Sequence, residues 1–103
     1  MAMQYDVKAS KPVTASGALK DQADNNLGRV RIKTIYGISN TNAGSVVLHD
    51  GADDTAPVLI TLNTPAKADS GTFWLSLPGE GILAENGVYA KVTATASVMV
   101  IYG

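Results

Sequence analysis

The chain has 103 residues, which is the size of one domain with one modest core. Eight Lys and Arg residues against nine Asp and Glu leave a formal net charge of −1, so composition predicts no nucleic-acid or anionic-membrane partner. The absence of cysteine excludes disulfides, thiolate metal sites and cysteine nucleophiles. No secretory signal opens the chain and no apolar run approaches the ~18 residues of a membrane-spanning helix, so we expect a soluble protein made in a cytoplasm.

The first part of the chain is weakly patterned. Residues 1–12 predict an extended N-terminal arm, in which Tyr5 and Val7 share one face of a short strand. A second short strand is expected between Pro12 and Leu19. The polar segment 21–28 predicts a loop, because Asp and Asn side chains bond to their own backbone and tolerate left-handed conformations.

Residues 29–38 form the clearest strand of the middle region, with strict alternation of side chains. This alternation predicts one core face and one basic face, and the basic face is either solvated or meets an acidic partner surface. The core face is predicted to carry Val30, Ile32, Thr34, Tyr36 and Ile38, and the basic face to carry Arg29, Arg31, Lys33 and Ile35.

Three shorter strands follow, over residues 45–49, 57–62 and 71–77. In the last of these, Phe73 and Leu75 occupy the core side, so Trp74 is predicted to point outward. Tryptophan is enriched among the residues that anchor protein interfaces. The pattern leaves open whether Trp74 contacts a partner or covers a second core layer.

The last third of the chain carries the strongest β-signal. Residues 82–85 have room for at most one helical turn. The pair Asn86-Gly87 that follows predicts a tight turn. In the strand that follows, Tyr89 faces away from the apolar side. The final strand is apolar on both faces, since Met99 and Ile101 alternate with valines, and such a strand is either central in the fold or covered by another subunit.

These runs predict the fold class. No window has apolar residues at helical spacing, whereas short alternating runs recur with Gly, Asn and Pro turns between them. We therefore expect an all-β protein, a single antiparallel β-sandwich or jelly roll over residues 13–103 with the arm at 1–12. An up-and-down barrel is the alternative.

Catalytic and metal-binding patterns are absent from the sequence. His49 is the only histidine, no Gly-x-Ser-x-Gly elbow accompanies it, and it fits a structural role at a strand end. Asp50, Asp53 and Asp54 lack the spacing of a calcium loop and read as a solvated turn. Glu80 and Glu85 flank a glycine turn as surface charges rather than as a catalytic pair. The sequence predicts no enzyme, no metal and no cofactor.

A resemblance covers residues 28–103 and is carried by turn-and-strand segments. They are Val46-Val-Leu-His-Asp-Gly51, Pro57-Val-Leu-Ile-Thr-Leu62, Gly81-Ile82, Asn86-Gly-Val-Tyr89 and Thr93-Ala-Thr-Ala-Ser-Val-Met-Val-Ile-Tyr-Gly103. The pattern resembles the small all-β virion structural proteins of tailed bacteriophages. The resemblance implies a sandwich or jelly-roll subunit that binds a capsid, neck or tail lattice and has no catalytic residues.

The leading hypothesis is a non-enzymatic capsid decoration or cement protein, located in the virion after synthesis in the host cytoplasm. It would be a homo-oligomer, with a trimer favoured, that bridges capsomers through the major capsid protein or other virion proteins. The alternatives are a head-tail connector, tail or fibre subunit, or a carbohydrate-binding β-sandwich in which Trp74, Tyr36 or Tyr89 stack on sugars. The expected partner interface comprises Trp74, Tyr89, Met99, Ile101, Ile35, Arg29, Arg31 and Lys33.

Overall fold

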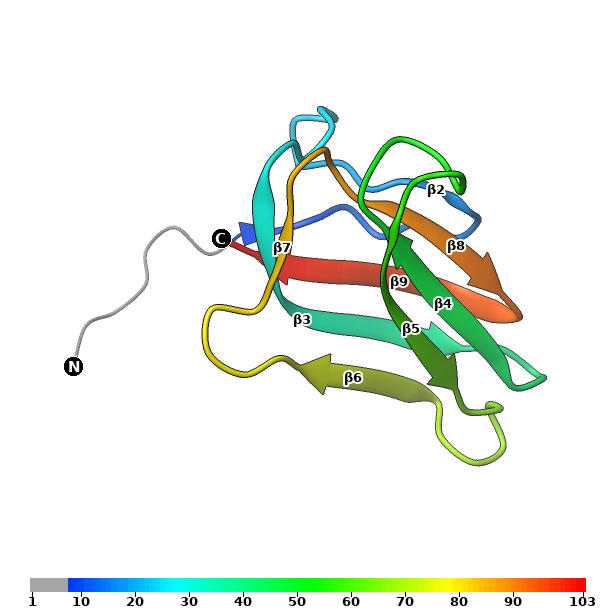
Figure 1. The fold of residues 1–103 in the computed structure, drawn as a ribbon. Coiled ribbons are helices and arrows are strands. Elements are labelled where there is room, and N and C mark those ends of the chain that lie inside the picture. The colour runs from blue at the N-terminus through cyan, green and yellow to red at the C-terminus, as the bar shows by residue number, and fades with distance from the viewer. Residues whose placement is uncertain (1–7) are drawn as a thin grey trace.

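The computed structural model describes residues 8–103, and two antiparallel β-sheets pack against each other in it (Figure 1). The expected strand at Tyr5 and Val7 lies outside the described residues. The strands of the described part are β1 (Lys8–Ala9), β2 (Gly17–Ala18), β3 (Val30–Ser39), β4 (Gly44–His49), β5 (Val58–Thr64), β6 (Thr72–Ser76), β7 (Ile82–Ala84), β8 (Tyr89–Thr93) and β9 (Thr95–Tyr102).

The first sheet has the order β1-β9-β3-β6, with β7 also paired to β3, and the second sheet has the order β2-β8-β4-β5. The predicted all-β class and the two-sheet antiparallel architecture are therefore confirmed. The barrel alternative is wrong for the described residues, because their strand pairings form two separate sheets rather than one closed one.

The pairing is nested about the loop between β4 and β5. From the inside outward, β4 pairs with β5, β3 with β6, β2 with β8 and β1 with β9. Two further ladders, β3 with β9 and β4 with β8, join these pairs within the two sheets. Apart from the consecutive strands β4 and β5, the strands of these pairs are therefore distant from each other in sequence.

Strand β3 corrects the predicted face assignment. Between the pairs Ile32↔Tyr102 and Thr34↔Ile101, β3 contains one extra residue, Lys33, as in a β-bulge. One extra residue moves every later side chain of the strand to the opposite face of the sheet. Ile35 is therefore buried in the core, whereas Tyr36 and Ile38 lie on the outer surface, opposite to the prediction.

Strands β8 and β9 are separated by Ala94 alone. Thr93 pairs with β4 in the second sheet, and Thr95 pairs with β3 in the first sheet, so the chain changes sheet at this residue. Ala94 has a φ of 48°, in the left-handed region that makes such a corner possible.

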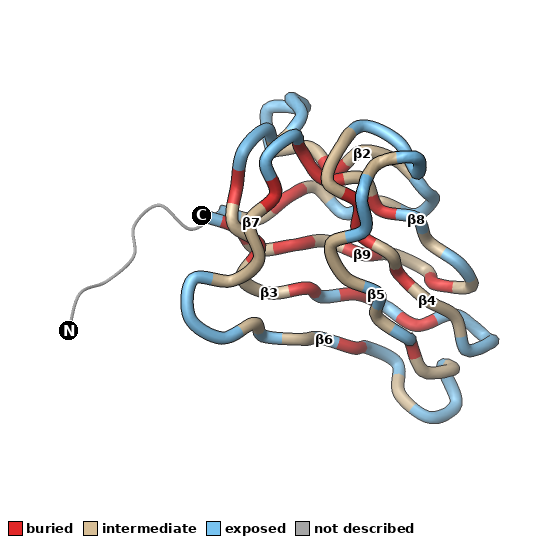
Figure 2. The backbone as a smooth tube through the Cα atoms, viewed as in Figure 1, coloured by how far each residue is buried: buried red, intermediate tan, exposed pale blue. Residues whose placement is uncertain are grey.

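The core lies between the two sheets, and Figure 2 shows buried stretches on β3, β4 and β9 with exposed loops around them. The period-two assignments for Val98 and Val100 and for Val46 and Leu48 are confirmed by full burial. The buried apolar side chains are Leu19, Val30, Ile32, Ile35, Val46, Leu48, Phe73, Ala84, Val88, Ala90, Val98, Val100 and Tyr102.

Two short segments pair outside the strands that alternation located. Residues 82–84, where the sequence has room for at most one helical turn, form strand β7 and pair with the first three residues of β3. The first described residues of the predicted arm pair with β9. The Ser10 amide donates to the Val100 carbonyl at 2.9 Å, and the Ser10 hydroxyl accepts from the Val100 amide at 3.0 Å.

Candidate interaction surface

Three large side chains form a row across the outer face of the first sheet. Tyr36 on β3 is directly opposite Trp74 on β6 and Met99 on β9. Residues directly opposite in antiparallel strands point to the same face with Cβ atoms roughly 4.5–5.5 Å apart. Trp74 is 67% exposed and Tyr36 is 38% exposed, so the row faces solvent. The predicted outward direction of Trp74 is confirmed.

Two aliphatic residues extend this row into a patch. Ile38 is 44% exposed and follows Tyr36 on the same face of β3, and the half-buried Ile101 follows Met99 along β9. We name these five residues, Trp74, Tyr36, Met99, Ile38 and Ile101, the apolar patch. Contiguous exposed apolar surface of this kind is typical of an interaction site, whereas single exposed apolar residues are ordinary.

The start of β3 carries a second feature, a hollow of about 280 Å³. Arg31 and Lys33 of β3 line it together with Arg29, which lies just before that strand. The rest of the lining consists of Val30, Glu80, Leu83 and Gly103. Arg31 pairs directly with Leu83 of β7, which places both side chains on the outer face of the first sheet. We name this site the basic hollow.

The bulge at Lys33 explains why both features share one face. With unbroken alternation, a strand that turns Arg31 outward would turn Tyr36 and Ile38 inward. The extra residue, Lys33, lets Arg31 point outward before it and lets Tyr36 and Ile38 point outward after it. Lys33 itself lines the basic hollow. The outer face of β3 is thus basic at its beginning and apolar at its end.

Two of the predicted interface residues lie elsewhere. Ile35 is fully buried, for the reason given by the bulge. Tyr89 belongs to the second sheet, where it is directly opposite His49 of β4 and makes an edge contact with that ring at a centroid distance of 6.0 Å. The other predicted residues, Trp74, Met99, Ile101, Arg29, Arg31 and Lys33, line the apolar patch or the basic hollow.

His49 lies at the end of β4 and is buried. Its Nδ1 is 2.9 Å from the carbonyl oxygen of Ala56, to which it donates, so the loop between β4 and β5 closes onto the ring. Its Nε2 is buried and has no hydrogen-bond partner among the described residues. No serine, threonine or carboxylate side chain bonds to the ring in the described part of the chain.

The acidic residues near His49 stabilise turns. The Asp50 carboxylate accepts hydrogen bonds from the backbone amides of Glu85 and Asn86 at 2.9 and 2.8 Å. Asp53 accepts from the hydroxyl and the amide of Thr55, and these bonds hold the pKa of the Asp53 carboxyl below its ordinary value. Within residues 8–103, no group of three or more His, Cys, Asp or Glu is placed to hold a metal ion.

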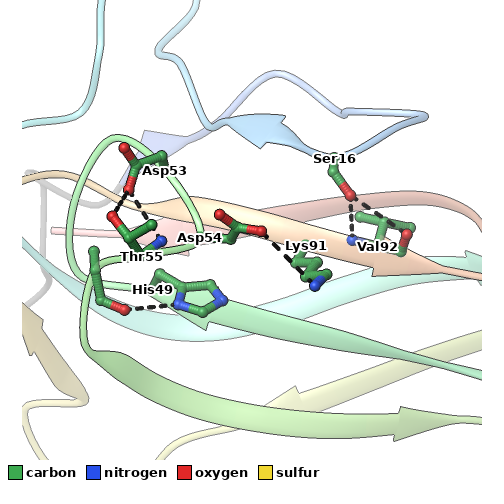
Figure 3. A network of polar contacts seen from close by, with 8 residues as sticks. Ser16, His49, Asp53, Asp54, Thr55, Lys91 and Val92 are labelled. Carbon is green, nitrogen blue, oxygen red and sulfur yellow. Dashed lines mark hydrogen bonds and ion pairs between the residues drawn. The ribbon is translucent and has the colours of Figure 1, made fainter.

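Figure 3 shows further polar contacts along the second sheet. Asp54 forms an exposed ion pair with Lys91 of β8 at 3.8 Å. Ser16, just before β2, accepts from the Val92 amide at 2.8 Å and donates to the Val92 carbonyl at 3.4 Å. These contacts are structural, and they leave Asp53 and Asp54 exposed.

A second hollow, of about 420 Å³, lies at the other edge of the first sheet. Lys8, Asp21, Gln22 and Tyr102 line it, together with two alanines. Burial of the ring, with the Asp21 charge nearby, raises the pKa of the Tyr102 hydroxyl above its ordinary value.

The sequence analysis left Tyr36 and Ile38 out of the expected partner interface, and it considered Tyr36 only as a sugar-stacking residue of the carbohydrate-binding alternative. Alternation alone assigns them to the core, and the only local sign of a change of phase is that Ile32 and Ile35 are three residues apart.

No protein-family model matches the chain, and no curated protein or solved structure matches it either. In the described part of the chain, no helix has the length and apolarity needed to cross a membrane.

Proposed function

We propose that the protein is a non-enzymatic structural subunit of a tailed-phage virion, and that it acts as a capsid decoration or cement protein. In this proposal it assembles as a homo-oligomer, with a trimer favoured, and bridges capsomers. The observation that carries the proposal is the apolar patch, where the exposed Trp74 and Tyr36 and the half-buried Met99 form one row. Interfaces are enriched in Trp, Tyr, Met and Arg, and this face of the first sheet presents all four.

The strand order supports a jelly roll as the finer description of the fold. A jelly roll is a double-sheet fold of eight strands built from two Greek keys, and it recurs in viral capsid and lectin domains. With the short β7 set aside, eight strands remain, and their four nested pairs divide into sheets β1-β9-β3-β6 and β2-β8-β4-β5. The fold alone is an analogy, so the functional proposal depends on the patch.

A repeated partner surface, such as a capsid lattice, would strengthen binding through the apolar patch. A single such contact gives modest affinity, because association must overcome lost translational and rotational freedom. When several subunits bind a repeated surface together, the later contacts form at high effective concentration and overall binding becomes much tighter. An oligomeric decoration protein would use this effect.

The test is light scattering of the purified protein beside two variants. Trp74→Ala should reduce self-association by about 2 kcal/mol, roughly thirtyfold in Kd, because a large anchor is lost from the contact. Thr61→Ala, at an exposed position on β5 in the second sheet, is the matched control and should leave the oligomer unchanged. An oligomer that is indifferent to Trp74→Ala would contradict the proposed contact.

The exposed Trp74 and Tyr36 also favour a second candidate, a carbohydrate-binding module. Adjacent aromatic faces can stack on sugar rings, and lectin domains share the jelly-roll architecture. Glycan-array binding that disappears in Trp74→Ala, from a protein that stays monomeric at all concentrations, would support this candidate over the lattice subunit. A head-tail connector, tail or fibre subunit would use the same patch, and immunogold labelling of virions would separate these locations.

A further inference from the structure

The arginines of the basic hollow have no carboxylate partner in the described part of the chain. The ion pairs there join Lys11 to Asp24 and Lys91 to Asp54, and neither involves Arg29 or Arg31. Arg31 lies in β3 and Arg29 lies in the bend directly before that strand, and both side chains line the hollow. Guanidinium groups bind carboxylates through two parallel hydrogen bonds, so the hollow is suited to accept an acidic group.

The size and charge of the hollow limit what it can hold. Its volume of about 280 Å³ is below the ~300–1,000 Å³ of sites for drug-sized ligands, and it is open rather than enclosed. Glu80 in its lining opposes a multiply charged anion such as phosphate. A carboxylate side chain from a protein surface fits both limits.

The chain itself presents such a surface in residues 50–57, which we name the acidic loop. Asp53 and Asp54 are exposed there, on the side of the second sheet (Figure 3). Asp53 stays ionised, because its bonds to Thr55 lower the pKa of its carboxyl. The pair of Asp54 with Lys91 is exposed on both sides and is therefore weak and exchangeable.

Apolar complementarity accompanies the charge complementarity. The basic hollow adjoins the apolar patch along β3. The acidic loop is followed directly by Val58, which is 57% exposed at the start of β5. Each surface thus combines a charged part with an apolar part, and the two charges are opposite.

We propose that the acidic loop of one copy of this chain inserts into the basic hollow of the next copy, and that Val58 then packs on the apolar patch. This inference rests on the proposed function, because it names the partner that covers the patch in the homo-oligomer. The contact joins two different surfaces, so it is a head-to-tail contact. Such contacts close into rings when the rotation between copies permits, as a trimer requires.

The experiment uses two variants that each remove one side of the contact. Arg29→Gln with Arg31→Gln neutralises the hollow, and Asp53→Asn with Asp54→Asn neutralises the loop. Light scattering should find each variant alone as a monomer under conditions where the unaltered protein is an oligomer. Thermal unfolding of both variants checks that they fold. Lys67→Gln, in an exposed loop, is the control and should assemble normally.

Mixing the two variants at equal concentration gives the decisive result. Each mixed pair regains one intact hollow and one intact loop, so we expect a 1:1 heterodimer that cannot grow into a ring. Salt should weaken this heterodimer by tenfold or more between 50 and 500 mM NaCl, because the contact is ionic. Folded variants that each assemble like the unaltered protein would overturn the inference. If Trp74→Ala still disrupts that assembly, the proposed function survives; an unaltered protein that never assembles would contradict both.

Discussion

Ala94 is the residue at which the chain changes sheet, and its backbone is strained. Its φ of 48° lies in the left-handed region, where a Cβ crowds the following carbonyl and costs roughly 1–2 kcal/mol. Asp24 is the other non-glycine residue with positive φ in the described chain, and it lies in the polar loop where Asp tolerates this conformation. The methyl side chain of Ala94 cannot form the local hydrogen bonds by which Asp tolerates this conformation.

Replacing Ala94 by glycine should therefore stabilise the fold. We expect Ala94→Gly to raise the free energy of unfolding by about 0.5–1 kcal/mol, after the entropy that glycine adds to the unfolded chain is included. Urea denaturation measures the change. Ala96→Gly is the control, because Ala96 is the extra residue at the second register shift of β9 and does not have a positive φ. Without that strain to relieve, this substitution should lower the free energy of unfolding by about 0.5–1 kcal/mol. Equal effects of both substitutions would contradict the strain at Ala94.

The Asp53 carboxyl has a pKa below its ordinary value of 3.8, chiefly because the Thr55 hydroxyl donates to it and then because the Thr55 amide does so. A lowered pKa in the folded state means that the ionised form stabilises the fold. This contribution is complete above pH 3.8 and is lost as the pH falls through the lower, folded-state pKa.

Removing the Thr55 hydroxyl should raise this pKa. In Thr55→Val the amide bond remains, so the pKa of Asp53 should move only part of the way toward its ordinary value. In Thr55→Ser the hydroxyl is kept and the pKa should stay close to that of the unaltered protein. NMR titration of the Asp53 carboxyl carbon measures both values, and a serine variant that titrates like the valine variant would disprove this explanation.

At the scale of elements, the close approach of β4 to the β8–β9 corner is built around Gly44. A Cβ added at Gly44 would lie 1.9 Å from the carbonyl oxygen of Thr93. The neighbouring pair Ser45↔Thr93 begins the ladder between β4 and β8, so this backbone cannot move without loss of pairing.

Gly44→Ala should consequently lower the free energy of unfolding by about 2–3 kcal/mol, the usual range for an overpacked site. The matched control is Gly17→Ala in β2, where an added Cβ meets nothing within 4 Å and the expected change is within about 0.5 kcal/mol. Guanidinium denaturation of the two variants makes the comparison. Similar losses in both variants would contradict the contact with Thr93 as the cause, because the entropic effect of replacing glycine by alanine is stabilising.

The elements also show which parts of the fold can be predicted from the sequence. Alternation located the strands from β3 onward to within a few residues, because one-sided burial imposes a period of two. It failed at Lys33, because a bulge is stabilised by the partner strand β9 and leaves no turn residue behind. It missed β7 because three residues are too few for a pattern, and their pairing partner is 50 residues away.

The whole molecule has a net charge near zero but distributes its charges unevenly. Arg29, Arg31 and Lys33 lie together on the first sheet, whereas Asp53 and Asp54 lie in the loop at the end of β4.

Trp74 could be assigned to the surface from its neighbours Phe73 and Leu75 alone. Its companion Tyr36 could not, because the surface is formed only when the bulge turns that residue outward.

Trp74 is the only tryptophan of the chain, so its fluorescence reports directly on the apolar patch. Its emission and its quenching by acrylamide should be measured together with light-scattering mass across a dilution series. The proposed contact predicts that emission shifts to the blue and quenching falls as the mass rises above that of one chain, because a 67% exposed ring becomes buried. An assembled protein in which Trp74 remains as exposed and as quenchable as in the monomer would contradict the central claim.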